Sequence, residues 1–157
     1  MFLGDVPVHA VTPAILQRAP DFSRPALNRV PVRLAGYRGK VVLLDFWATW
    51  CAPCLTEIPH FMQWQNQYGP QGLQVLGVSM DDDDSAVRRL TAKLRVNYPV
   101  VMGDEKLAGL YGGILGLPVT YLIDRNGIIQ ARFQGETDPA RIEAALNRLL
   151  SAKPAQR

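Results

Sequence analysis

A continuous apolar run and a second, mostly apolar one indicate the centre of a β-sheet. The first, residues 41–47, is apolar except for Asp45, and the second covers residues 73–80. Runs of this kind are typical of strands that are buried on both faces. Each run is followed by a helical pattern, and strands that alternate with helices predict an α/β fold.

Four helical segments are predicted. The longest, of about fifteen residues, begins near Pro53, where the first turn tolerates a proline, and its apolar residues recur at helical spacing. The next follows four aspartates at residues 81–84. Acids are favoured at a helix N-terminus by the macrodipole, and a cation site is the alternative interpretation. A helical turn is predicted near residues 107–111, and a helix over residues 139–151 closes the pattern.

Shorter patterns complete the predicted sheet. Residues 118–123 and 128–133 flank an Asp-Arg-Asn-Gly turn, whose chemistry is typical of a β-hairpin. A short strand is predicted at residues 99–101, and the proline-containing residues 30–34 predict an edge strand. We therefore expect a three-layer α/β sandwich, in which helices flank a central mixed sheet and a helix–strand segment is inserted.

The first part of the chain differs from the rest. Residues 1–18 have weak periodicity and two prolines, so we expect an N-terminal extension or strand before a single domain of residues 19–157. A domain of this size buries a core without a disulfide staple. The start of the chain lacks the basic and apolar regions of a signal peptide, and no apolar stretch approaches the ~20 residues that span a bilayer. A native tether or signal outside this sequence stays open.

Composition argues against two classes of function. The net charge is +3 and the basic residues are scattered singly, so we expect no nucleic-acid partner. A zinc site needs four ligands, or three and a water. The chain has two cysteines and only His9 and His60 as histidines, without a second C-x-x-C. We therefore expect no metal and no other cofactor.

The candidate chemistry lies in Cys51-Ala52-Pro53-Cys54, where a buried strand meets a helix N-terminus. A bridge over so short a loop constrains the unfolded chain little, so the pair indicates reactivity rather than stability. Backbone N–H groups and the helix dipole favour a thiolate here, and cysteine pKa values in such motifs fall from about 8.5 to ~3.5–7.5. We expect Cys51, at an exposed tip, to be the nucleophile, and Cys54, one turn inward, to resolve the mixed disulfide.

The sequence DFWATWCAPC at residues 45–54 resembles the active-site signature of the thioredoxin superfamily. The Gly39-Lys40 pair, Tyr98-Pro99 and the GLPVTYLID stretch at residues 116–124 narrow the resemblance to the TlpA/ResA-like branch. The resemblance extends from about residue 19 to residue 151. It implies a thioredoxin-like fold and a reductase of protein disulfides that is periplasmic or otherwise extracytoplasmic. A cytoplasmic location is the alternative.

The resemblance also implies roles around the cysteines. Asp45 stands where thioredoxins bury an acid that exchanges a proton with the second cysteine, but residues 73–80 lack the lysine that accompanies it there. Glu57 stands where an acid helps to set the properties of the thiols. Pro118 matches a proline held in cis, which leaves the backbone of Leu117 to pair with an extended client segment. The other expected client contacts are Trp50, Ala52, Pro53 and Gly135.

Two other functions stay open on the sequence. Peroxiredoxins share the Ala-Pro-Asp-Phe of residues 19–22, but their Pro-x₃-Thr/Ser-x₂-Cys pattern meets Leu44 and Ala48 here. A redox-linked copper chaperone or docking module would use both thiols as ligands, although a third soft ligand is missing.

Under the favoured interpretation, the partners are client proteins such as apocytochrome c or a copper-site assembly protein, and an upstream thiol electron donor. We expect a monomer.

Overall fold

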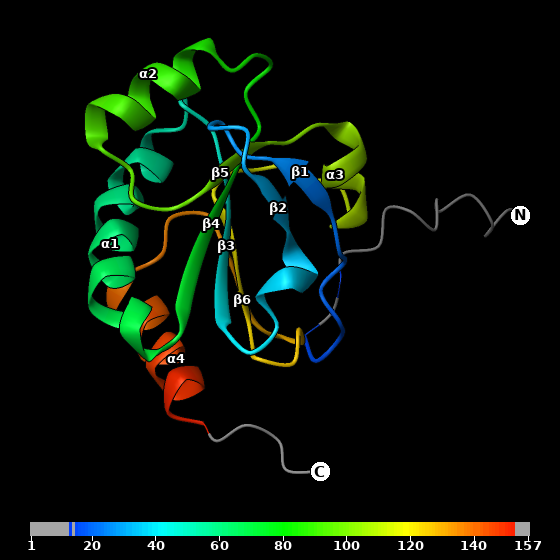
Figure 1. The fold of residues 1–157 in the computed structure, drawn as a ribbon, viewed down its shortest axis with the longest axis vertical. Helices are drawn as coiled ribbons and strands as arrows, with labels where there is room; N and C mark the ends of the chain where they lie inside the picture. Colours follow the sequence, from blue (N-terminus) through cyan, green and yellow to red (C-terminus); the bar gives the residue numbers. More distant parts are fainter. Residues whose placement is uncertain (1–12, 14, 153–157) are drawn as a thin grey trace, which may run out of the picture.

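Five strands form the central sheet of the computed structural model, which describes residues 13 and 15–152. They are β3 (Val41–Trp47), β4 (Leu73–Ser79), β5 (Val100–Met102), β6 (Val119–Ile123) and β7 (Ile129–Gln134). Their spatial order is β5-β4-β3-β6-β7, which places β3 in the middle (Figure 1). Because β3 pairs parallel with β4 and antiparallel with β6, the sheet is mixed, as the sequence predicts.

Every residue of β3 is buried, which explains its continuous apolar run. Side chains alternate between the faces of a strand, so β3 contributes to two separate cores. Val41, Leu43 and Trp47 belong to one core, and Val42, Leu44 and Phe46 belong to the other. By the same alternation, the fully buried Asp45 faces the core that contains Trp47.

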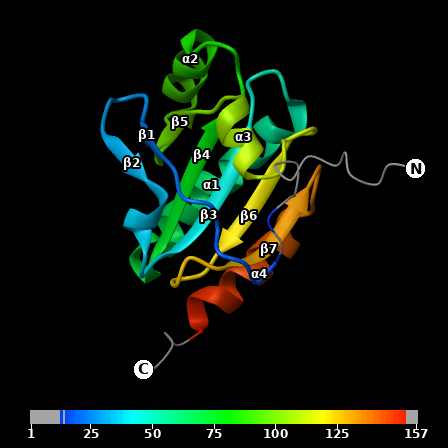
Figure 2. The same ribbon diagram turned by 90° about the vertical axis from the view of Figure 1, so that its right-hand side faces the viewer.

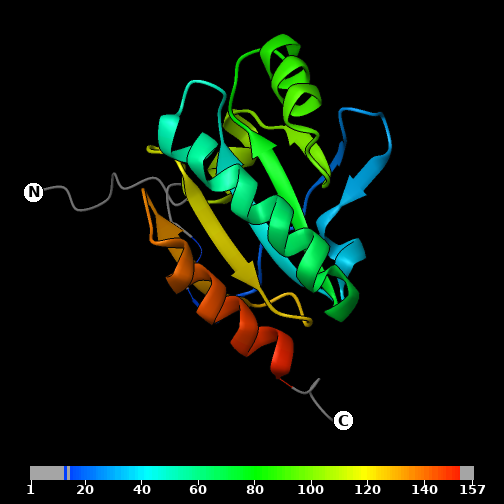
Figure 3. The same cartoon turned by 90° about the vertical axis from the view of Figure 1, so that its left-hand side faces the viewer.

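Helices α1 (Ala52–Tyr68) and α4 (Pro139–Ser151) cover this Trp47 face of the sheet (Figures 1 and 3). Their inward residues and Val87 of α2 (Ser85–Leu94) share one core with the strands. The buried hydrophobic residues of the two covering helices are Cys54, Ile58, Phe61, Trp64, Tyr68, Ile142, Ala145, Leu146 and Leu150.

The opposite face carries a smaller layer (Figure 2). It consists of α3 (Glu105–Leu110) and two short strands, β1 (Ser23–Pro25) and β2 (Pro31–Arg33), which pair antiparallel as a separate sheet. The predicted strand at residues 30–34 is therefore present, and its partner is β1. This layer, the central sheet and the helices of the other face complete the predicted three-layer sandwich, with α2 and β5 as the inserted helix–strand segment.

The described part of the predicted N-terminal extension lies along β7. Leu16 N–H donates to the carbonyl oxygen of Ile129 at 2.7 Å, and Arg18 forms a β-bridge with Ile128. Most of residues 1–18 lie outside the described residues, and a domain boundary at residue 18 stays a prediction. Over residues 13 and 15–152, no helix combines the length and apolarity needed to cross a membrane.

Candidate active site

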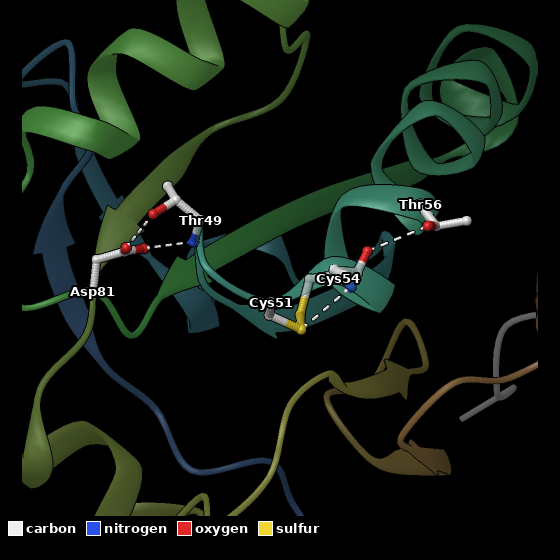
Figure 4. Close-up of a disulfide and its surroundings, with 6 residues drawn as sticks. Thr49, Cys51, Cys54, Thr56 and Asp81 are labelled. Atoms are coloured by element: carbon white, nitrogen blue, oxygen red, sulfur yellow. Dashed lines mark hydrogen bonds between the residues drawn. A yellow bond between two sulfur atoms is a disulfide. The ribbon is translucent and has the colours of Figure 1, made fainter.

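The two cysteines lie at the start of α1, directly after the loop that leaves β3. Cys51 caps the helix: its Sγ accepts the N–H of Cys54 at 3.3 Å, and its carbonyl accepts the N–H of Leu55 at 3.2 Å. A disulfide joins the pair, with 5.3 Å between the Cα atoms (Figure 4). Pro53 occupies the first turn, where a helix needs no donor from it. The predicted helix-tip position of Cys51 is confirmed.

Cys51 is less accessible than the sequence predicted. The residue is only 6% exposed, so the expectation of an exposed tip is wrong. The reason is that capping turns Sγ toward the first turn of α1, where Cys51 packs into the Trp47 core. Cys54 is fully buried, and Cys51 is therefore the outer cysteine of the pair. The neighbouring Trp50 is 70% exposed and forms the surface beside the disulfide, and Ala52 is exposed as well.

Two buried acids accompany the first turns of α1. Asp45 is fully buried on β3, and Glu57, one turn after Cys54, is 5% exposed. Neither carboxylate oxygen of Asp45 nor Oε1 of Glu57 accepts a hydrogen bond from the part of the chain that the structure describes. Burial raises the pKa of Asp45 well above its ordinary value, and the Glu57 charge raises it further. The nearby Thr120 side chain on β6 lowers this pKa, and its effect is the smallest of the three.

The same environment acts on Glu57 and on a tyrosine. Burial, followed by the charge of Glu136, raises the pKa of Glu57 to about 7. Burial, followed by the charges of Asp45 and Glu57, raises the pKa of Tyr98 well above its ordinary value. The sequence assigned both acids through the resemblance but gave no role to Tyr98, although Tyr98-Pro99 carries part of that resemblance. An acid with a pKa near 7 can hold or release a proton at neutral pH.

No cation compensates Asp45 from β4. The residue paired with Asp45 on that strand is Gly77, in agreement with the missing lysine noted in the sequence. A side chain at this position would crowd its neighbours, because a Cβ on Gly77 would lie 3.1 Å from Nε1 of Trp47 and 3.4 Å from Cε1 of Tyr98. The glycine thus makes room for two aromatic rings beside the buried acid.

The predicted client-contact residues lie at the same end of the sheet as the cysteines. Because Phe46 pairs with Val119, the segment that enters β6 lies beside the loop that leaves β3 (Figures 2 and 3). The Leu117–Pro118 peptide bond is cis, as the resemblance implied. Gly135 adjoins this bond, since its N–H donates to the carbonyl of Pro118 at 2.8 Å. The structure therefore brings Leu117, Pro118 and Gly135 together.

The four aspartates at residues 81–84 do not act as one helix-terminal group. Asp84 is the N-cap residue of α2, and the side chain of Asp83, just before it, accepts the N–H of Ser85 at 2.8 Å. Asp81 is 8% exposed and binds Thr49 in the loop before the cysteines (Figure 4). The helix-dipole interpretation is therefore wrong for Asp81, because a tertiary contact holds it away from the helix. Within the described ranges, no three His, Cys, Asp or Glu side chains gather as a metal site would require.

Comparison with known proteins agrees with this geometry. Residues 15–132 match the AhpC/TSA family. The chain is 33% identical to the thiol-disulfide oxidoreductase ResA of Geobacillus kaustophilus, over 90% of this chain and 79% of that protein. It is 30% identical to ResA of Bacillus thuringiensis, over 85% of this chain and 77% of that protein. A putative thiol:disulfide interchange protein DsbE from Chlorobium tepidum superposes with a TM-score of 0.84 and 31% identity, covering 89% of this chain and 100% of that one.

These matches extend over most of the chain, and the relatives are named for exchange between thiols and disulfides. The same chemistry is present here in the Cys51–Cys54 disulfide at the start of α1. The chain belongs to the AhpC/TSA family, and it is a ResA-like thiol-disulfide oxidoreductase that acts on the thiols of client proteins.

Proposed function

We propose that this chain is a reductase of protein disulfides. The observation that carries the proposal is the pair of buried acids, Asp45 and Glu57, near the start of α1. When ionised, these acids disfavour thiolates at the neighbouring cysteines and so destabilise the reduced form of the protein. A strong oxidant of this superfamily depends on a stabilised reduced form. A destabilised reduced form instead favours a protein that gives its electrons to a client.

The reaction uses two displacements. The Cys51 thiolate attacks a client disulfide, forms a mixed disulfide with one client sulfur and releases the other as a thiolate. Asp45 then accepts the proton of Cys54, and the Cys54 thiolate attacks Sγ of Cys51 and releases the second client sulfur. Two electrons thereby pass to the client, and the protein is left with the Cys51–Cys54 disulfide. An upstream thiol donor reduces this disulfide again, so no other cofactor is required.

The proposed clients are apocytochrome c or a copper-site assembly protein outside the cytoplasm, and the chain acts as a monomer. The support is its similarity to proteins named ResA and DsbE. An extended client segment would pair with the backbone of Leu117 beside Pro118. Trp50, Ala52, Pro53 and Gly135 would line the contact.

Equilibration with glutathione redox buffers tests the direction of electron flow. We expect a reduction potential nearer to about −270 mV than to about −120 mV, the values of a reductant and a strong oxidant of this superfamily. Glu57→Gln should raise the potential by about 30 mV for each pKa unit of thiolate stabilisation that it restores. The matched control is Glu105→Gln, an exposed site on α3. A potential near about −120 mV in the unaltered protein would contradict the proposal.

Trapping tests the proposed roles of the two cysteines. Cys54→Ser should accumulate mixed disulfides with client proteins through Cys51, because no thiol remains to resolve them. Cys51→Ser should accumulate far fewer. Non-reducing electrophoresis followed by mass spectrometry identifies the captured clients and the cysteine that holds them. Equal capture by both variants would exclude the proposed order of attack.

A further inference from the structure

Asp81 is a buried acid that takes no part in the proposed proton transfer. It lies two residues beyond the end of β4 and is 8% exposed. Its Oδ2 accepts the backbone N–H of Thr49 at 3.0 Å, and its Oδ1 accepts the Thr49 hydroxyl at 2.5 Å (Figure 4). The Ser79 hydroxyl also donates to Oδ2 at 2.7 Å and accepts the Asp81 N–H at 3.1 Å. Ser79 therefore fixes the Asp81 carboxylate, and this carboxylate in turn fixes Thr49.

Thr49 belongs to the turn that delivers Cys51 to the helix. Within this turn, the N–H of Cys51 donates to the carbonyl of Ala48 at 3.2 Å. Just before it, the N–H of Met80 donates to the carbonyl of Trp47 at 2.7 Å, which joins the ends of β3 and β4. Thr49 donates to one carboxylate through both its backbone N–H and its side-chain hydroxyl. Asp81 therefore fixes the position of the Thr49 backbone in the middle of the turn, and also the orientation of the Thr49 side chain.

We propose that Asp81 is a positioning residue for Cys51. By fixing the turn at Thr49, it holds Sγ of Cys51 at the N-cap of α1, where the N–H of Cys54 points at the sulfur. In the oxidised protein the disulfide adds a covalent constraint on Cys51. In the reduced protein that constraint is gone. The contact between Asp81 and Thr49 therefore has its largest effect on the state that attacks a disulfide. The inference holds for thiol–disulfide exchange in either direction.

Thr49→Val provides the principal test, because it removes the hydroxyl donor without changing any charge. We measure the pH dependence of Cys51 alkylation in the reduced protein. The apparent pKa of the Cys51 thiol should rise by about half a unit, because the sulfur moves away from the helix terminus. At a pH below the pKa, the fraction of Cys51 present as thiolate then falls about threefold. Thr49→Ser keeps both donors, so the apparent pKa of Cys51 should stay at the value of the unaltered protein. Asp45, Glu57, Tyr98 and Glu136 also act on this environment, and they are unchanged in these variants.

Asp81→Asn separates positioning from simple electrostatics. Loss of a nearby negative charge would by itself lower the thiol pKa, whereas release of the turn raises it, so the sign of the shift distinguishes the two. The matched control is Asp104→Asn. Asp104 accepts hydrogen bonds from Arg24 at 2.9 and 3.1 Å and from the N–H of Leu107 at 2.9 Å, but it caps α3 on the opposite face of the sheet.

Urea unfolding of each variant completes the experiment. Asp104→Asn should lower stability and leave the Cys51 pKa unchanged. If Thr49→Val and Asp81→Asn also lower stability without raising the Cys51 pKa, Asp81 has only a structural role and the inference is overturned. Should Asp81→Asn fail to fold, Thr49→Val decides the matter, because it keeps the backbone hydrogen bond to Asp81. The equilibrium potential, which tests the reductase proposal, is a separate measurement.

Discussion

Glu57→Gln should stabilise the oxidised protein above neutral pH and leave its stability almost unchanged in mild acid. Burial, followed by the charge of Glu136, raises the pKa of Glu57 from 4.5 to about 7. The folded protein therefore holds a proton that the unfolded chain has already lost. The stability linked to this proton is fully present below about pH 4.5 and is lost as the pH rises through about 7. Glutamine keeps the volume of the side chain and cannot ionise.

The size of the effect follows from the shift. At about 1.36 kcal/mol per pKa unit, the shift corresponds to about 3 kcal/mol, and screening by solvent reduces this to about 2 kcal/mol. Urea unfolding between about pH 4.5 and pH 8 measures it, with the disulfide intact so that the thiols do not titrate. Glu105→Gln, at an exposed site, should show no pH-dependent gain. An equal stability difference between Glu57→Gln and the unaltered protein at every pH would refute the reasoning.

Three further outcomes are expected. In the reduced protein, Cys51 should be alkylated faster than Cys54 with an apparent pKa below about 8, because it caps the helix; the reverse order would exchange their roles. Asp45→Asn should slow the attack of Cys54 on the mixed disulfide in stopped-flow experiments at neutral pH, and an unchanged rate would leave Asp45 a structural role only. Gly77→Ala should lower the free energy of unfolding by about 1–3 kcal/mol, because its methyl meets Trp47. Urea titration with no loss of stability would show that the ring moves aside easily.

The elements with repeated local signals could be predicted from the sequence. The run at Val41–Trp47 requires cover on both faces, and the Asn-Gly turn before β7 dictates a hairpin. The pairing of β1 with β2 could not be predicted in the same way. Each strand has only three residues, too few for a period, and the partner is chosen by contacts with the core beneath them.

In the active site, too, the features that depend on local sequence could be predicted, and those that depend on tertiary contacts could not. The spacing of Cys51 and Cys54 is local, so both the pair and its place at a helix N-terminus could be predicted. Asp81 could not, because its partner Thr49 lies 32 positions away and four consecutive aspartates are typical of a helix start. The burial of Cys51 could not be predicted for a related reason, since the direction of a capping side chain depends on the tertiary packing around it.

Both edges of the central sheet have a neighbour over a short stretch. Ala26 forms a β-bridge with Val101 of β5, and Arg18 forms one with Ile128, directly before β7. This matters under the proposed function, in which an extended client segment pairs with the protein's backbone. Bare sheet edges act as templates for aggregation, and unfolded chains offer strands to pair with them. At the bridged positions, a client strand finds the backbone groups already taken. Adventitious pairing is thus blocked along these stretches, so that a client's stay on the protein can end when its sulfur leaves Cys51.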